Sequence, residues 1–151
     1  MNVKPNIQNA KPVEDLTSRV VRAKDMPWQK MRFSGCEMKT LLFDPKSGLA
    51  TMLMRMEPGA VLPDHEHVLI EQTYVLEGSL VDKEGPDAGL SVGPGEFVWR
   101  PAGSRHTAWS PKGGTFIAMF QIPNKFFEKD GRVVDAGGKE WDPAWSQLLS
   151  K

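Results

Sequence analysis

Two histidines, His65 and His67, lie two residues apart in the stretch HEHVLIEQTYVLEG, and the only other histidine of the chain is His106. Alternate side chains of a β-strand point to the same face, so His65 and His67 would face the same way, about 6.6 Å apart along the strand. Two imidazoles placed in this way can converge on one metal ion. Glu71 has the same parity, but a straight strand would carry it roughly 13 Å beyond His67. If Glu71 is a ligand, the chain must bend before it, and His106 must arrive from a third strand.

The glycines and prolines around these residues also follow a regular spacing. One group consists of Gly59, His65, His67, Glu71 and Gly78, and the other of Gly95, Pro101, Gly103, His106 and Ser110. In order and spacing the two groups resemble the two motifs of the cupin superfamily, except that Ser110 stands where the family usually has Asn. The resemblance covers about a third of the chain and implies a small antiparallel β-barrel of the RmlC-like jelly-roll type. It also implies one divalent metal ion, held by His65, His67, Glu71 and His106.

The ligand set that this resemblance implies indicates a catalytic rather than a structural metal ion. Three imidazoles and one carboxylate suit Fe(II), Mn(II), Zn(II), Ni(II) or Cu(II). On an octahedral ion, four protein ligands leave two positions for water, substrate or dioxygen. The chain has a single tyrosine, Tyr74, and no further histidine, so few side chains remain to act as a general base. We therefore expect chemistry led by the metal ion, with iron(II) favoured and with Glu71 or a metal-bound hydroxide handling protons.

Longer stretches are similar to particular cupins. MRMEPGAVLPDHEHVLIEQTYVLEGSLVD and PAGSRHTAWSPKGGTFI resemble the cupin domain of ChrR-type anti-sigma factors. IPNKFFEKDGRVV resembles the tail of cupin dioxygenases that cleave carbon–carbon bonds in acetylacetone or dihydroxyacetophenone, although the acetylacetone enzyme lacks a glutamate at the position of Glu71. These resemblances imply a mononuclear non-haem dioxygenase that acts on a small β-diketone or hydroxyketone. Two alternatives stay open: a non-catalytic ChrR-like sensor module that binds metal or a small ligand, and a metal-dependent isomerase or hydrolase.

The elements that must position these residues are predicted to be short strands. Runs such as MKTLLFD, LATMLMRM, QTYVLE and TFIAMFQI end at turn segments, and the chain holds 14 glycines and 12 prolines. This pattern is typical of an all-β sandwich or barrel, and it includes a strand-like run at RVVRA. The last part of the chain predicts a hairpin that turns at Asp130-Gly131, followed by a short C-terminal helix with Asp142 as N-cap and Pro143 in first position.

Length and composition indicate one soluble domain, with residues 1–18 as a polar N-terminal arm and residues 19–151 as a single cupin domain whose motif core is 59–110. Nineteen basic residues balance nineteen acidic ones, so we expect no nucleic-acid or membrane partner. The single cysteine, Cys36, excludes an intrachain disulfide, and no stretch resembles a signal peptide or membrane span, so we expect a cytoplasmic protein. We expect a small-molecule substrate and a homodimer, with the arm or the tryptophan-bearing tail at its interface.

Two sets of apolar side chains are predicted to pack in the core. The methionines at positions 52, 54 and 56 alternate along one strand, and a flexible wall of a substrate pocket is the alternative for them. The aromatic set, for which the core is expected first and a pocket second, consists of Phe97, Trp99, Phe116 and Phe120.

Two arginines, Arg100 and Arg105, flank the turn that precedes His106. A guanidinium there could grip a carboxylate or enolate of a substrate, because it offers a planar fork of donors. Surface ion pairs are the commoner outcome for such residues, and we expect that for this pair.

Overall fold

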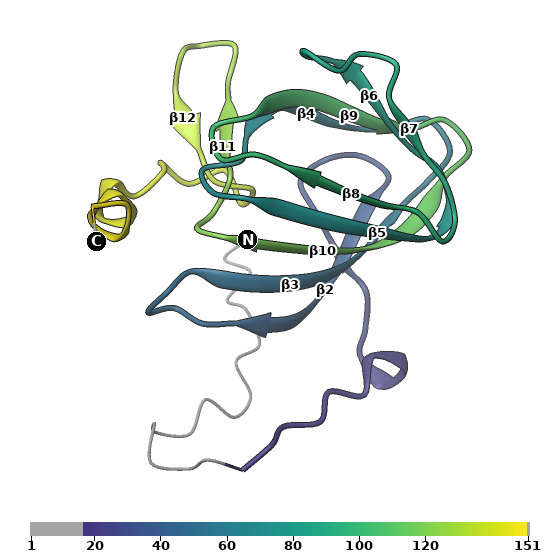
Figure 1. Cartoon of the computed structure of the whole chain (residues 1–151), viewed down its shortest axis with the longest axis horizontal. Coiled ribbons are helices and arrows are strands. Elements are labelled where there is room, and N and C mark those ends of the chain that lie inside the picture. The colour runs from purple at the N-terminus through teal and green to yellow at the C-terminus, as the bar shows by residue number, and fades with distance from the viewer. Residues whose placement is uncertain (1–16, 151) are drawn as a thin grey trace.

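In the computed structural model, which describes residues 17–150, two antiparallel six-stranded sheets pack face to face as a jelly-roll barrel (Figure 1). Sheet 1 contains, in spatial order, β1 (Gln29–Lys30), β2 (Cys36–Phe43), β3 (Leu49–Met56), β10 (Gly114–Gln121), β5 (Glu71–Gly78) and β8 (Phe97–Arg100). Sheet 2 contains β12 (Val133–Val134), β11 (Lys125–Phe127), β4 (Ala60–Glu66), β9 (Arg105–Ser110), β6 (Leu80–Glu84) and β7 (Ser91–Val92). The predicted all-β jelly-roll fold is confirmed.

The interior of the barrel follows from the alternation of side chains along the strands. On β5, Glu71, Thr73 and Val75 are buried, whereas Gln72 and Tyr74 are exposed. Because alternate residues of a strand point to opposite faces, one face of sheet 1 is turned toward sheet 2. The core between the two sheets includes Val75, Leu80, Ala108, Phe116 and Phe126.

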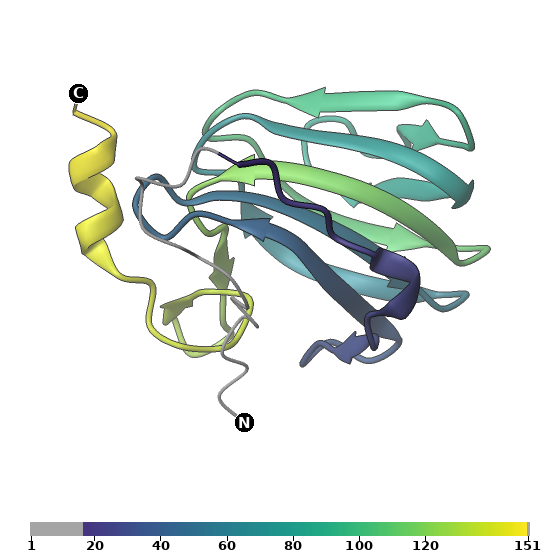
Figure 2. The same cartoon turned by 90° about the horizontal axis from the view of Figure 1, so that it is seen from below.

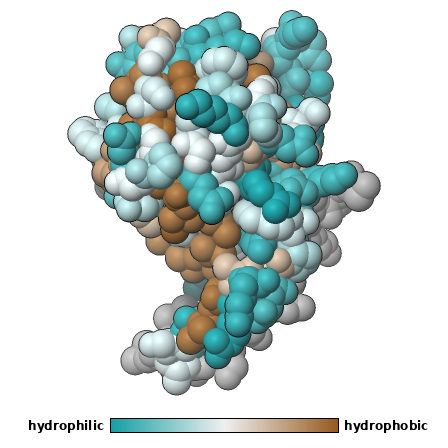
Figure 3. Space-filling view, turned by 90° about the vertical axis from the view of Figure 1, so that its right-hand side faces the viewer, coloured by the Kyte–Doolittle hydropathy of each residue, from teal (hydrophilic) through white to brown (hydrophobic). Residues whose placement is uncertain are grey.

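The aromatic residues of β8 lie outside this core. Phe97 and Trp99 are 52% and 58% exposed, so the prediction that they pack in the core is wrong. β8 is an edge strand of sheet 1, and its register places Phe97 opposite Tyr74 and Trp99 opposite Gln72, on the outer face. Apolar surface is not confined to this strand, since Figure 3 shows an apolar band between polar side chains on one end of the molecule.

The described chain begins with residues 17–22, which form no regular element, and with the 3-10 helix η1 (Ala23–Asp25). The predicted strand at RVVRA is therefore absent, because β1 pairs with β2 at that edge of sheet 1. η1 lies against the outside of sheet 1 instead (Figure 2), where Lys39 Nζ donates to the Ala23 carbonyl at 2.7 Å. The predicted N-terminal arm falls almost wholly on residues 1–16, outside the described residues, so its part in a homodimer stays a prediction. Neither helix found in residues 17–150 is long and apolar enough to cross a membrane.

The C-terminal elements agree with the sequence. β11 and β12 form the predicted hairpin, with Gly131 in its turn at φ +88°. The short terminal helix η2 (Pro143–Leu148) is a 3-10 helix, and the Asp142 side chain caps it by accepting from the Ala144 N–H at 2.9 Å. Trp141, just before η2, is buried, and its Nε1 donates to the Pro123 carbonyl at 2.8 Å. The helix is thereby held at one end of the barrel.

Gly78, the last residue of β5, lies very close to the backbone of Gly113, and a substitution there tests this close approach. Its φ is +74°, and a Cβ at this position would lie 1.8 Å from the carbonyl oxygen of Gly113. We expect Gly78→Ala to lower the free energy of unfolding by about 3 kcal/mol or more, because the left-handed backbone costs about 1–2 kcal/mol and the steric clash adds to it. Gly59→Ala is the control, since Gly59 has φ +82° but nothing within 4 Å of such a Cβ, and it should cost only about 1 kcal/mol. Denaturant titration measures both, and equal losses would contradict the close approach at Gly78.

Candidate metal centre

The three histidines come from two neighbouring strands of sheet 2 and from the segment directly after one of them. His65 lies on β4, directly opposite His106 on β9. His67 follows β4, and its backbone is fixed to the turn before β9: its N–H donates to the Ser104 carbonyl at 2.9 Å and its carbonyl accepts from the Gly103 N–H at 2.7 Å. All three side chains are buried. The fold therefore holds three imidazoles rigidly inside the barrel.

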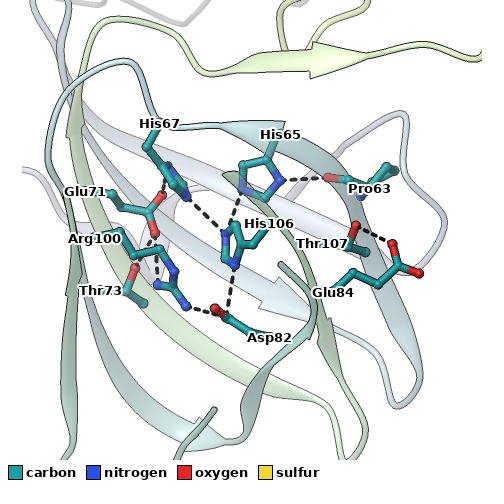
Figure 4. A network of polar contacts seen from close by, with 10 residues as sticks. All are labelled: Pro63, His65, His67, Glu71, Thr73, Asp82, Glu84, Arg100, His106 and Thr107. Carbon is teal, nitrogen blue, oxygen red and sulfur yellow. Dashed lines mark hydrogen bonds and ion pairs between the residues drawn. The ribbon is translucent and has the colours of Figure 1, made fainter. Parts of the chain in front are cut away.

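The Nε2 atoms of the three rings meet at one place (Figure 4). His106 Nε2 lies 3.0 Å from His67 Nε2 and 3.1 Å from His65 Nε2. Two nitrogen ligands about 2.1 Å from an ion are about 3.0 Å apart at a right angle and about 3.4 Å apart at the tetrahedral angle. The three histidines thus form a group that can hold one metal ion, and the observed spacing suits neighbouring ligands on an octahedral ion.

The ring of His65 is set up to present a lone pair at Nε2. Its Nδ1 lies 2.7 Å from the Pro63 carbonyl oxygen, and because a carbonyl only accepts, Nδ1 carries the hydrogen. Burial, together with the nearby His67 and His106, lowers the pKa of His65 to about 3. At neutral pH this imidazole is therefore neutral, as a metal ligand requires.

A carboxylate lies behind each of the other two rings. Glu71 Oε2 is 2.8 Å from His67 Nδ1, and Asp82 Oδ1 is 3.0 Å from His106 Nδ1. Arg100 lies between the carboxylates, with guanidinium nitrogens 2.5 Å from Asp82 Oδ1 and 3.6 Å from Glu71 Oε1. Neither Nδ1 has an aligned hydrogen-bond partner, so the carboxylates face the two rings mainly as charges. Acceptors in this position orient a ligating imidazole and raise its basicity.

Both carboxylates are held in the charged form. Burial alone would raise the pKa of Glu71, but His67, His65 and Arg100 outweigh it and lower that pKa to about 2. Burial would likewise raise the pKa of Asp82, and its contacts with His106 and Arg100 hold it below its usual value. Two buried negative charges therefore stand behind the histidine group, with a single guanidinium between them.

The structure does not bring Glu71 to the point where the three Nε2 atoms meet. The bend that the sequence required is present, since the chain leaves β4 of sheet 2 at Glu66 and resumes at Glu71 as β5 of sheet 1. The side chain then turns to Nδ1 of His67, and its Oε1 accepts from Thr73 Oγ1 at 3.1 Å. Three of the four residues that the resemblance implies as ligands are together, and direct ligation by Glu71 stays a prediction.

Two residues of the site, Asp82 and Arg100, are not those that the sequence pattern predicts. Asp82 is 3% exposed on β6, and the available signal was an acidic residue two positions after the buried Leu80, on the inward face of a strand. Arg100 was expected in a surface ion pair but is 6% exposed, because β8 places it opposite Glu71. Arg105 does form the expected surface pair, with Asp64 at 2.5 Å.

A cavity of about 220 Å³ adjoins the histidine group and is lined by His65, His106 and Glu71. Its wall also contains Phe116, Phe120 and the methionines at positions 52, 54 and 56. Met56 and Phe116 belong to the buried core as well, as expected, whereas Met52, Met54 and Phe120 are only half-buried. Core packing is therefore confirmed for Met56, and all three methionines also line the cavity, as the alternative interpretation expected.

Comparison with known proteins agrees with this geometry. A family model described as ChrR Cupin-like domain matches residues 17–125, and no match was found among curated proteins. Solved structures with the same fold include a candidate acetylacetone dioxygenase from Methylibium petroleiphilum PM1, at 20% identity and TM-score 0.72 over 89% of this chain and 96% of that one. An acetylacetone dioxygenase from Acinetobacter johnsonii has 17% identity and TM-score 0.66 over 94% and 96% of the two chains.

A third solved structure, an RmlC-like cupin from Ralstonia eutropha JMP134, has 17% identity and TM-score 0.69 over 89% of this chain and 86% of its own. At these identities the similarity to the three structures shows the fold alone.

The carboxylate behind His106 gives a direct test of the support around the histidines. We expect Asp82→Asn to weaken zinc binding by about 10- to 100-fold, because the substitution removes the charge facing Nδ1 while keeping the size of the side chain. Competition with a zinc chelator measures the affinity. Asp64→Asn is the control, since Asp64 is 40% exposed and pairs with Arg105 at the surface, and it should bind zinc like the unaltered protein. An unchanged affinity in Asp82→Asn would show that the carboxylate plays no part in metal binding.

Proposed function

The chain belongs to the ChrR Cupin-like domain family, and from that premise we propose that it is a mononuclear metal-dependent dioxygenase. Its substrate in this proposal is a small molecule that carries a carbonyl group, a β-diketone or a hydroxyketone, and its favoured metal is iron(II). The observation that carries the proposal is the meeting of three buried Nε2 atoms, 3.0 and 3.1 Å apart, at the wall of a cavity. The likeness in fold to an acetylacetone dioxygenase supports the choice of reaction.

In this proposal His65, His67 and His106 hold the metal ion. When bound, such an ion would supply a Lewis acid for a carbonyl oxygen of the substrate, with dioxygen as the oxidant. Three protein ligands would leave positions open for other ligands, as a catalytic site requires and a closed structural site does not. The chain's own contribution is to fix the three rings from behind, through the Pro63 carbonyl, Glu71 and Asp82.

Glu71 has the position for a second role. It is buried and lines the cavity, its Oε1 accepts a hydrogen bond from Thr73 Oγ1, and its Oε2 lies 2.8 Å from His67 Nδ1. We propose that its carboxylate keeps His67 oriented. The expected role of Glu71 in handling protons stays a prediction, because a pKa of about 2 makes this carboxylate a weak base. Ligation of the metal by Glu71 itself would require the carboxylate to leave His67 Nδ1.

A non-catalytic sensor is the second candidate, because the matching family is described as ChrR Cupin-like domain and the sequence resembles the cupin domain of ChrR-type anti-sigma factors. A buried histidine group beside a cavity would serve equally to bind a metal or a small ligand. The two functions differ in turnover: a sensor would bind its ligand without consuming it.

Oxygen uptake separates the two. We expect the iron(II)-loaded full chain to consume dioxygen in proportion to one member of a panel of β-diketones and hydroxyketones. His106→Ala should lower the rate at least about a hundredfold, because an open three-imidazole site cannot form without it. Gln72→Ala, at an exposed position beside Glu71 on β5, should leave the rate unchanged. No uptake with any member of the panel, in protein that binds iron stoichiometrically, would rule out the dioxygenase and favour the sensor.

A further inference from the structure

The cavity beside the histidine group exists because small side chains occupy inward positions of three strands. Ala50 on β3, Ala108 on β9 and Ala118 on β10 are buried and all line it. The register places Ala118 opposite Met52 and Ala50 opposite Phe120, so a small side chain faces a large one at each level. A wall of alanines and flexible methionines encloses about 220 Å³. Since a cavity of about 150 Å³ holds a benzene molecule, this one has room for roughly nine non-hydrogen atoms.

The charges around the cavity are of one sign, apart from the metal ion that it would hold. Among residues 17–150, no lysine or arginine lines it, whereas the carboxylates of Glu71 and Asp135 do. Arg100, the guanidinium that lies behind the histidines, is engaged with Glu71 and Asp82. Arg105 lies outside, paired with Asp64 at the surface. Neither arginine is therefore placed to bind an anionic substrate. The possibility that the sequence left open for them is not met in the structure.

We propose that the cavity is a specificity pocket for an uncharged, apolar group of the substrate, and that it excludes substrates with a carboxylate or phosphate at the end remote from the metal. The inference that the substrate has a metal-binding head rests on the proposed function. The size and charge that we infer for its remote end depend only on the residues of the cavity wall. An anion in this position would lose its water and find no lysine or arginine on the wall to replace it, since Thr73 Oγ1 already donates to Glu71 and the Asn124 amide carries no charge. The flexible methionines would accept apolar groups of different shapes.

Two β-diketones that share the same metal-binding group but differ in the charge of the remote group test the charge preference. 4,6-Dioxoheptanoate and 7-methyloctane-2,4-dione differ only in that an isopropyl group replaces the carboxylate. Both are titrated into the zinc-loaded full chain, because zinc is not redox-active and no turnover interferes. The ultraviolet band of the metal-bound diketonate reports that the head is on the metal. We expect the neutral compound to bind at least about a hundredfold more tightly, and equal or tighter binding of the carboxylate would overturn the proposal.

Two substitutions in the wall test the pocket itself. Ala118→Leu fills the space beside Met52 and should weaken binding of the neutral diketone at least about tenfold, with zinc affinity unchanged. Met52→Ala enlarges the same space and should shift the preference toward a bulkier tail, so the pair stays informative if Ala118→Leu folds poorly. Met119→Leu is the control, since Met119 pairs with the exposed Gln72 and does not line the cavity. Unchanged selectivity in both wall variants would show that the tail binds elsewhere.

The outcomes separate this inference from the proposed function. Tight binding of the neutral diketone to the zinc form without oxygen uptake by the iron form would refute the dioxygenase and support the pocket. Oxygen uptake with a substrate whose remote end is anionic would support the dioxygenase and overturn the pocket's charge preference.

Discussion

Three buried imidazole nitrogens meet inside the barrel, with His106 Nε2 3.0 and 3.1 Å from those of His67 and His65, and the residues around them are arranged to support this meeting point. Their lone pairs repel unless a proton or a metal cation lies between them. The surrounding residues favour the cation, because an oxygen atom stands behind every ring: the Pro63 carbonyl, Glu71 and Asp82. Arg100 keeps the two carboxylates together inside the barrel, where two uncompensated negative charges would otherwise be costly.

The jelly-roll barrel supports this meeting point by using both sheets. Sheet 2 supplies the rings of His65 and His106 side by side from β4 and β9, and sheet 1 supplies Glu71 and Arg100 as neighbours on β5 and β8. The same inward faces carry alanines and methionines further along the strands, so the histidine group opens onto an apolar cavity rather than onto solvent. A polar cluster at one end and an apolar wall at the other is the arrangement expected of a small-molecule site.

The sequence predicts the fold and the three histidines because both depend on local spacing: strand parity places His65 and His67 on one face, and the glycines mark the turns. The features that the sequence does not predict depend on contacts between residues far apart in the chain. The exposure of Phe97 and Trp99 follows from the place of β8 at a sheet edge, and the burial of Arg100 from its position opposite Glu71. Asp82 went unnoticed because only the folded barrel brings it to His106. The position of Glu71 behind His67 likewise depends on the angle at which β5 begins.

X-ray absorption spectroscopy of the full chain, loaded with one equivalent of iron(II) or zinc, shows directly whether the three histidines bind one metal ion. Imidazole rings bound to a metal give characteristic multiple-scattering features, and their number can be counted. We expect three imidazoles with metal–nitrogen distances of about 2.1 Å, completed by oxygen ligands. A metal bound by fewer than three imidazoles, or no stoichiometric binding of either metal, would contradict it.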